Sequence, residues 1–125
     1  MPTVNLTEAT FGDAIRDNEI VLVDFWAAWC GPCRAFAPVF ERAAAQHTDI
    51  VFGKVDTEAE QALSAQANIT SIPMLMAFRQ GILVFAQPGA LPAHGLEQVI
   101  AAVRGLDMDA VRTKIAAQQA AQPTR

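Results

Sequence analysis

The strongest constraint on this chain is the placement of its only two cysteines, at the two ends of Cys30-Gly31-Pro32-Cys33. They follow an apolar run typical of a strand, residues 20–28, and lead into a run typical of a helix, residues 35–46. A C-x-x-C pair alone is ambiguous, but one placed between a strand and a helix predicts redox chemistry. Because Pro32 has a fixed φ and no backbone N–H, it suits a first helical turn, which places Cys30 at the helix N-terminus.

This placement predicts different roles for the two cysteines. Unpaired N–H groups and the dipole at a helix N-terminus favour an anion, so we expect Cys30 to supply the attacking thiolate. Cys33 stands three residues further on and therefore lies on the same helix face. It can attack a mixed disulfide formed at Cys30 and release the reduced substrate.

Three other interpretations of the cysteine pair stay open at this point. A structural disulfide closing so short a loop would constrain the unfolded chain little. A zinc site would need two more ligands, and His47 and His94 are too far apart for the usual histidine spacing. The third interpretation is two unrelated core cysteines.

Composition narrows the classes of partner. A chain of 125 residues fits one domain, and its net charge of −4 without a run of like charges argues against nucleic acid and against an anionic membrane surface. We see neither a signal peptide at residues 1–5 nor a stretch near the ~20 apolar residues that span a bilayer. Two cysteines in one C-x-x-C, without a signal, predict a reducing compartment.

The first third of the chain predicts a strand, a helix and a second strand. Residues 3–6 are a short strand candidate. Thr7 is the expected N-cap of a helix that runs to about Asp17, with Phe11 packing against Leu6 as a hydrophobic staple. The continuous apolar run that follows, residues 20–26, predicts a central strand buried on both faces.

Asp24 is the exception in that apolar run, and two interpretations of it stay open. A buried carboxyl is costly unless it has partners. It is either a buried acid or base that exchanges a proton with Cys33, its pKa raised by desolvation, or a strand-end residue that caps the next turn.

The motif helix and the strand after it carry three residues of interest. Pro38 should kink the helix. Arg34 either tunes the cysteines and steers partners or is simply solvated. The next strand candidate, residues 50–55, contains Lys54, which either faces the surface or pairs with Asp24; the residues alone favour the surface.

The middle of the chain predicts a helix and a hairpin. Residues 57–60, Thr-Glu-Ala-Glu, indicate a capping box that opens a helix carrying Leu63. The runs 74–79 and 82–86 around Gln80-Gly81 predict an antiparallel hairpin. Beyond it we expect a helix that ends at Gly105, a short helix after Asp107 and a tail that frays from Gln118.

From Val23 to Cys33 the chain reads Val-Asp-Phe-Trp-Ala-Ala-Trp-Cys-Gly-Pro-Cys, which resembles the signature of the thioredoxin family. The resemblance covers residues from about 4 to 105. Further features then arrive in the family's order: Pro38, Lys54, Ile72-Pro73, Gly81 and Gly89-Ala90-Leu91.

The resemblance implies a fold and a domain division. It implies an α/β thioredoxin fold, with a central mixed β-sheet flanked by helices on both faces. Residues 1–106 would be the thioredoxin domain, and residues 107–125 a C-terminal extension made of a short helix and a frayed tail.

The resemblance also implies roles for individual residues. Asp24 corresponds to the family's buried carboxylate and Lys54 to its lysine partner, which favours the catalytic interpretation of both. Pro73 corresponds to a cis-proline, although trans is the default for an X–Pro bond. The substrate surface around Cys30 would be formed by Trp29, Gly31, Pro32, Ile72, Pro73, Gly89 and Ala90, with Trp26 packed beneath the motif and Pro38 nearby.

Two departures from the family pattern bear on the range of substrates. Met74 follows the proline where the family usually carries threonine, and Pro88 precedes the glycine where a small aliphatic residue is usual.

The activity implied is protein disulfide reduction that contributes to cell redox homeostasis. Electrons would come from NADPH through a flavin-containing thioredoxin reductase, with no cofactor or metal bound by this chain. We expect disulfide-containing client proteins as partners, no nucleic acid or membrane, a monomer and a cytoplasmic location. One rival is an oxidase or isomerase, which Gly31-Pro32 disfavours, and the other is a redox-independent client-binding module.

Overall fold

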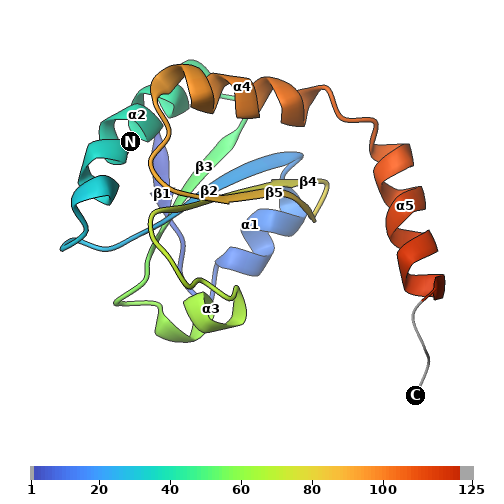
Figure 1. Ribbon diagram of the computed structural model, residues 1–125, viewed down its shortest axis with the longest axis horizontal. Coiled ribbons are helices and arrows are strands. Elements are labelled where there is room, and N and C mark those ends of the chain that lie inside the picture. The colour runs from blue at the N-terminus through green and yellow to red at the C-terminus, as the bar shows by residue number, and fades with distance from the viewer. Residues whose placement is uncertain (1, 122–125) are drawn as a thin grey trace.

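The structure is a computed structural model that describes residues 2–121 of the chain, and strands and helices alternate along most of it (Figure 1). The strands are β1 (Thr3–Asn5), β2 (Ile20–Trp26), β3 (Val51–Asp56), β4 (Met74–Arg79) and β5 (Ile82–Pro88). The helices are α1 (Phe11–Asp17), α2 (Gly31–Gln46), α3 (Gln61–Gln66), α4 (Ala93–Arg104) and α5 (Met108–Ala121).

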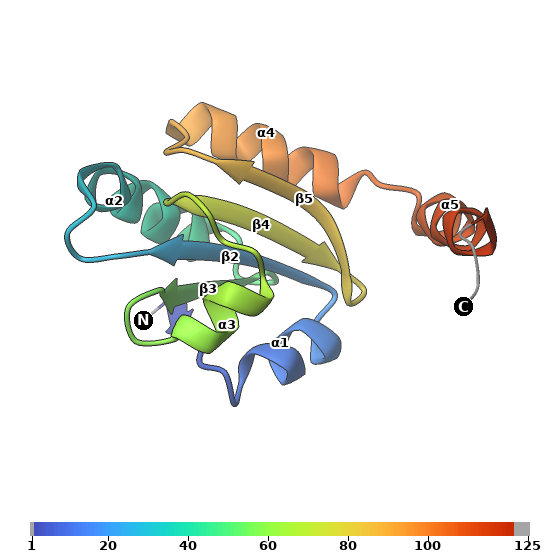
Figure 2. The same cartoon turned by 60° about the horizontal axis from the view of Figure 1, so that its bottom comes forward.

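The strands form one mixed sheet in the order β1-β3-β2-β4-β5. β1, β3 and β2 run parallel, and β4 and β5 are antiparallel to their neighbours. The apolar run of β2 lies at the centre of this sheet, as predicted. α2 and α4 cover one face and α1 and α3 the other (Figure 2), which confirms the predicted mixed sheet with helices on both faces.

Side chains of β2 alternate between two cores, because successive residues of a strand point to opposite faces. Leu22 packs among side chains of α2 and α4, whereas Val21, Val23 and Phe25 pack with residues of α1 and α3. Asp24 stands two residues after Leu22 and therefore faces the α2 layer. This alternation places the only charged residue of β2 beneath the motif helix.

Two predicted helix starts are wrong, and hydrogen bonds explain both. Thr7 does not cap a helix, because residues 8–10 form a turn and α1 begins at Phe11. The predicted capping box at residues 57–60 does not form, and α3 begins at Gln61. The Thr57 N–H and hydroxyl both donate to the Trp26 carbonyl, at 2.9 and 3.0 Å, and the Glu60 carboxylate accepts from the Glu8 N–H instead.

The predicted hairpin is present, and β5 extends two residues further than expected, to Pro88. Gln80 and Gly81 both have positive φ, +53° and +77°, which is the conformation of a tight type I′ turn. At Gly53 of β3, a Cβ would overlap the Leu6 side chain, so glycine permits close packing there.

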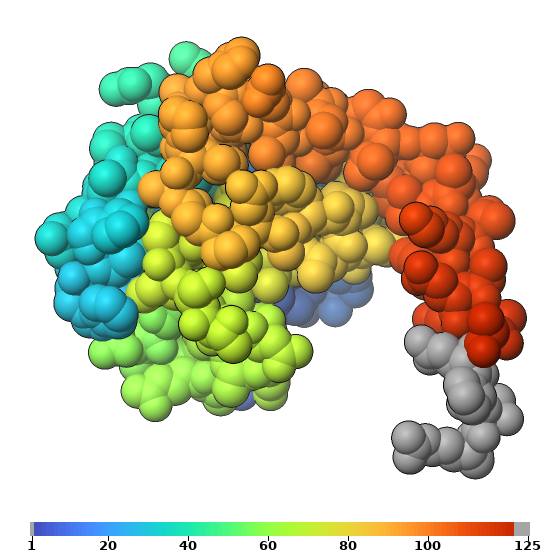
Figure 3. Space-filling view, in the orientation of Figure 1, coloured from blue at the N-terminus to red at the C-terminus, as the bar shows by residue number. Residues whose placement is uncertain are grey.

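The C-terminal helix α5 stands off the body of the molecule (Figure 3). The Asp107 carboxylate accepts from the Ala110 N–H at 3.1 Å and so caps α5, as predicted, and Met108 is buried. The frayed tail expected from Gln118 is wrong for residues 118–121, which are helical. The rest of that predicted tail, residues 122–125, lies outside the described residues.

Candidate active site

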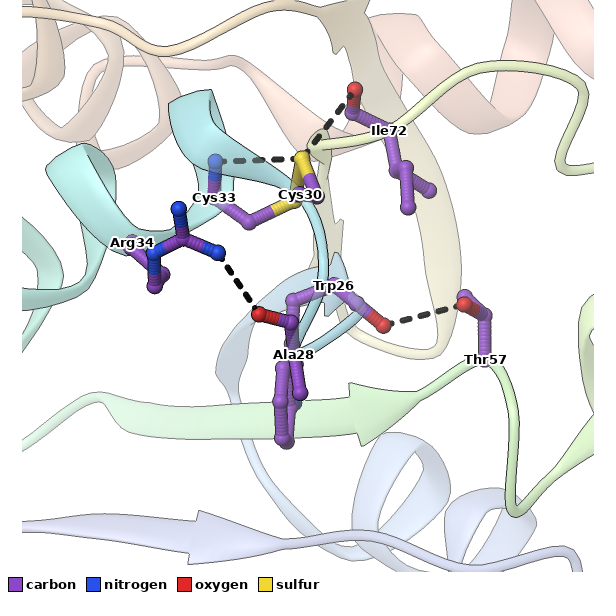
Figure 4. The surroundings of a disulfide bond; sticks show 7 residues. All are labelled: Trp26, Ala28, Cys30, Cys33, Arg34, Thr57 and Ile72. Atoms are coloured by element: carbon purple, nitrogen blue, oxygen red, sulfur yellow. Dashed lines mark hydrogen bonds between the residues drawn. A yellow bond between two sulfur atoms is a disulfide. The ribbon is translucent and has the colours of Figure 1, made fainter.

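Cys30 and Cys33 form a disulfide at the N-terminus of α2, with their Cα atoms 5.2 Å apart (Figure 4). Cys30 is the N-cap, Pro32 lies in the first turn, and the Cys33 N–H donates to the Cys30 Sγ at 3.2 Å. That donor and the helix dipole stabilise negative charge on Cys30 rather than on Cys33. The attacking role of Cys30 and the resolving role of Cys33 stay predictions, which this geometry supports.

The peptide bond between Ile72 and Pro73 is cis and lies beside the disulfide. The Cys30 Sγ is 3.8 Å from the Ile72 carbonyl oxygen, and Figure 4 shows the two facing each other. The Pro73 carbonyl accepts from the Gly89 N–H at 2.8 Å, which ties the end of β5 to this segment. The structure thus brings Ile72, Pro73 and Gly89 together near Cys30.

Trp29 is 67% exposed, an unusual state for so large an apolar side chain. A groove of about 390 Å³ beside it is lined by Trp29, Ile72 and residues of the segments 57–65 and 69–71. Gly31 and Pro32 are exposed on the first turn of α2, and Ala90 is exposed just after Gly89. Pro38 is exposed within α2, and its neighbour Ala37, rather than Pro38, lines the cavity described next.

Asp24 is completely buried, and neither of its carboxylate oxygens has a hydrogen-bond partner among the described residues. Burial raises its pKa to about 7, an effect opposed by the charge of Lys54 and reinforced by the charge of Glu41. Asp24 lines a cavity of about 250 Å³ together with Cys33, Arg34 and Lys54. A carboxyl that changes protonation near neutral pH therefore shares a cavity with the predicted resolving cysteine.

Lys54 is directly beside Asp24 in the register of β2 and β3, and its side chain is 17% exposed, so the surface interpretation is wrong. Its ammonium lies 3.8 Å from a Glu41 carboxylate oxygen and 5.3 Å from the Trp26 ring centroid. Trp26 is half-buried against the two cysteines, as expected of a residue packed beneath the motif.

Sequence reasoning left the role of Arg34 open and missed Glu41. The Arg34 guanidinium donates to the Ala28 carbonyl at 2.8 Å and so bridges the loop before Cys30 (Figure 4). Glu41 was not among the predicted site residues, yet its carboxylate reaches Lys54 and the Thr3 hydroxyl. No local pattern announces either contact, because each depends on which strand or loop the helix packs against.

Among residues 2–121, no helix is long and apolar enough to cross a membrane. In the same range, no group of three or more His, Cys, Asp or Glu side chains is arranged to hold a metal ion.

Comparisons with known proteins agree on one family. Residues 2–102 match the family model described as Thioredoxin. The chain is 56% identical over 118 residues to "Putative thioredoxin 2" of Streptomyces coelicolor, covering 94% of this chain and 88% of that protein. It is 43% identical over 102 residues to a thioredoxin of Alicyclobacillus acidocaldarius, covering 81% of this chain and 97% of that protein.

A solved structure gives the same result for the fold. A mutant thioredoxin from Halobacterium salinarum superposes with a TM-score of 0.77 at 32% identity, covering 84% of this chain and 94% of that one. The Streptomyces match is long enough to extend beyond residue 106 into the α5 region.

Proposed function

Because the chain belongs to the thioredoxin family and is a dithiol–disulfide oxidoreductase of that type, we propose that it reduces protein disulfides through Cys30 and Cys33. The observation that carries the detailed mechanism is the cavity that Cys33 shares with the buried, unpaired Asp24. The fold class and activity that the sequence predicted are confirmed. The redox-independent client-binding alternative is not favoured.

In the first step, the Cys30 thiolate attacks one sulfur of a client disulfide. A bond forms between Cys30 and that sulfur, and the other client sulfur leaves as a thiolate and takes up a proton. The hydrogen bond donated by the Cys33 N–H and the dipole at the N-terminus of α2 stabilise the attacking thiolate before this step.

In the second step, Cys33 resolves the mixed disulfide. The Cys33 thiol gives its proton to the Asp24 carboxylate, directly or through water in the shared cavity. The resulting thiolate attacks the Cys30 sulfur, which forms the Cys30–Cys33 disulfide and releases the second client thiolate. Two electrons have then moved from the protein to the client. The positive charge of Lys54 would favour the carboxylate form of Asp24, which accepts the proton.

The client would bind across the exposed surface around Cys30. An extended segment could pair with the backbone of Ile72, next to Pro73, as a strand pairs with a free edge. Trp29 would offer apolar contact on one side of it. Gly31, Pro32, Gly89 and Ala90 would form the rest of the contact surface, and their small or rigid side chains allow close approach.

Members of this family exchange disulfides with client proteins and with a thioredoxin reductase in general. We extend this to recycling of the present chain by a flavin-containing reductase that takes electrons from NADPH. We further propose that the protein acts as a monomer in the cytoplasm, where its two cysteines would be kept reduced.

A trapping experiment tests the two-step mechanism. Insulin is supplied as the client, with NADPH and a thioredoxin reductase, to the parent, Cys30→Ser and Cys33→Ser. We expect turnover only by the parent and a covalent insulin adduct, visible by mass spectrometry, only with Cys33→Ser. An adduct on Cys33 in the Cys30→Ser protein, together with no adduct on Cys30 in the Cys33→Ser protein, would reverse the proposed roles.

A further inference from the structure

Glu41 is held beside the Asp24 site by contacts from two strands. Its two carboxylate oxygens lie 2.9 and 2.8 Å from the Thr3 hydroxyl of β1, which donates to them. One of the same oxygens lies 3.8 Å from the Lys54 ammonium of β3. Glu41 itself is half-buried, with 32% of its side chain exposed, so its charge is only partly screened by water.

Lys54 therefore has two possible acidic partners and contacts only one. It is the register neighbour of Asp24 across the parallel pair of β2 and β3. Its ammonium is nevertheless turned to Glu41 and the Trp26 ring, and both Asp24 oxygens are without a hydrogen-bond partner among residues 2–121. A lysine that paired with Asp24 directly would stabilise the carboxylate form.

We propose that Glu41 is a positioning residue of the reaction: anchored by Thr3, it holds the Lys54 ammonium toward Trp26, so that Lys54 does not pair directly with the Asp24 carboxyl. The proposal rests on the proton exchange between Asp24 and Cys33 proposed above. It assigns to the N-terminal strand β1, far from the cysteines in sequence, an effect on the active site.

The charges that face Asp24 come from two of its neighbouring elements. β3 contributes Lys54, while α2 contributes Glu41 and Arg34, and Arg34 lines the same cavity as the disulfide-bonded Cys33. On the other side, the register partner on β4 is Leu75, which carries no charge. The negative charge of Glu41 and the positive charge of Lys54 have opposite effects on the pKa of Asp24, so removing Glu41 has a defined sign.

The direct test is the titration of Asp24 followed by carboxyl carbon NMR in the oxidised protein, in which neither cysteine titrates. We expect Glu41→Gln to lower the pKa of Asp24 by roughly one pH unit, because a repelling charge is lost and Lys54 is freed to approach. Glu41→Asp keeps the charge and should move the pKa less. Glu97→Gln removes a half-exposed carboxylate that pairs with His47, and should leave Asp24 unchanged.

A double-mutant cycle tests whether Glu41 acts through Lys54. In a Lys54→Met background, Glu41→Gln should shift the pKa of Asp24 by clearly less than in the parent. An equal shift in both backgrounds would overturn the positioning role, because Glu41 would then act by its own charge alone. No shift, or a rise, on Glu41→Gln in the parent background would overturn it as well.

The rate profile separates this inference from the proton exchange on which it rests. If both hold, Glu41→Gln moves the acidic limb of the insulin-reduction rate to lower pH, by the same interval as the NMR titration. If Asp24→Asn has the parent's pH profile, the proton exchange itself fails, whatever the NMR titration reports. If Asp24→Asn loses the acidic limb but Glu41→Gln leaves it in place, only the role of Glu41 fails.

Discussion

Buried and half-buried polar groups have hydrogen-bond partners at one end of strand β2 and lack them at the other. Near Ile20, the half-buried Arg79 side chain donates to three main-chain carbonyls at and just beyond the end of α4. The guanidinium and the three carbonyls thus all have hydrogen-bond partners. At the end that leads to Cys30, the Asp24 carboxylate and the Trp26 indole N–H are buried without partners among the described residues. Unpaired buried polar groups are rare and costly, and proteins keep them where they serve function.

Two aspartates summarise the difference. Asp49, near the satisfied end, is exposed and bound by the Arg104 guanidinium, which lowers its pKa to about 2. Asp24 is buried away from water, which raises its pKa to about 7. An aspartate thus stabilises the fold as a paired carboxylate at position 49, whereas at position 24 it can bind and release a proton near neutral pH.

The largest predicted effect is on stability at the unpaired end. The folded pKa of Asp24, about 7, is above its ordinary value of 3.8, so the folded state binds the proton more tightly than the unfolded chain. This contribution to stability is present below about pH 4 and is lost as pH rises to about 7. Relative to Asp24→Asn, the oxidised parent should lose about 4 kcal/mol between pH 4 and pH 8.

Urea unfolding at several pH values measures this difference. Asn cannot ionise, so the gap between variant and parent should widen with pH and level off above pH 8. A gap that stays constant from pH 4 to pH 8 would show that Asp24 ionises normally and would remove the contrast between the two ends.

The second effect is on rate. Asp24→Asn removes the proton acceptor for Cys33, so we expect insulin reduction at pH 7 to slow by about 10²-fold, with a flatter pH profile. The fold should stay intact by near-ultraviolet circular dichroism. Unchanged rates across the pH range would sink the proposed proton exchange.

At the satisfied end, Arg79→Ala should affect stability and not chemistry. It leaves three carbonyls near the end of α4 without their donor, which should cost about 1–3 kcal/mol in urea unfolding. Insulin turnover per folded molecule should not change. Arg16→Ala removes an exposed arginine that pairs with Asp13 and Asp17 of its own helix and serves as the control, with little expected change.

Removal of α5 tests the proposed division at residue 106. A chain that ends at Leu106 should keep full insulin turnover, because α5 stands away from α2 (Figure 1), whose N-terminus carries the cysteines. Its thermal midpoint should fall modestly, since the packing of the buried Met108 side chain and the contact between Arg112 and Gln80 are both lost. A large loss of turnover would instead make α5 part of the functional surface.

The smallest effect is expected at Asp49. The folded pKa of Asp49 is below its ordinary value, so its pair with Arg104 stabilises the fold above about pH 4, and this is lost as pH falls toward 2. Asp49→Asn should therefore be slightly less stable than the parent at pH 7, and the difference should vanish at the lowest pH. Insulin turnover should be unaffected; a clear loss would mean that the two ends are coupled.

Local sequence signals predicted the parts of the molecule that local physics decides. The apolar run of β2, the position of Pro32 and the Gln80-Gly81 turn all led to the observed elements. The starts of α1 and α3 were wrong because Thr7 and Thr57 bond in turns or to other strands rather than capping helices.

The residues of the candidate site also divide into those that local sequence signals predicted and those that they did not. Cys30 and Cys33 were predicted from their spacing and their placement between a strand and a helix, whereas the cis form of Pro73 and the burial of Lys54 came only from the family resemblance. Glu41 was missed because its contacts with Thr3 and Lys54 join segments distant in sequence, and a charged residue on a helix is ordinarily solvated.

The most direct test of the central claim is reduction of insulin with dithiothreitol as the only source of electrons, which requires no reductase. The parent should accelerate the reduction well beyond dithiothreitol alone, and Cys30→Ser should return the rate to that background. A parent rate equal to the background, or a Cys30→Ser rate equal to the parent's, would contradict the assignment of Cys30 as the attacking thiolate of a disulfide reductase.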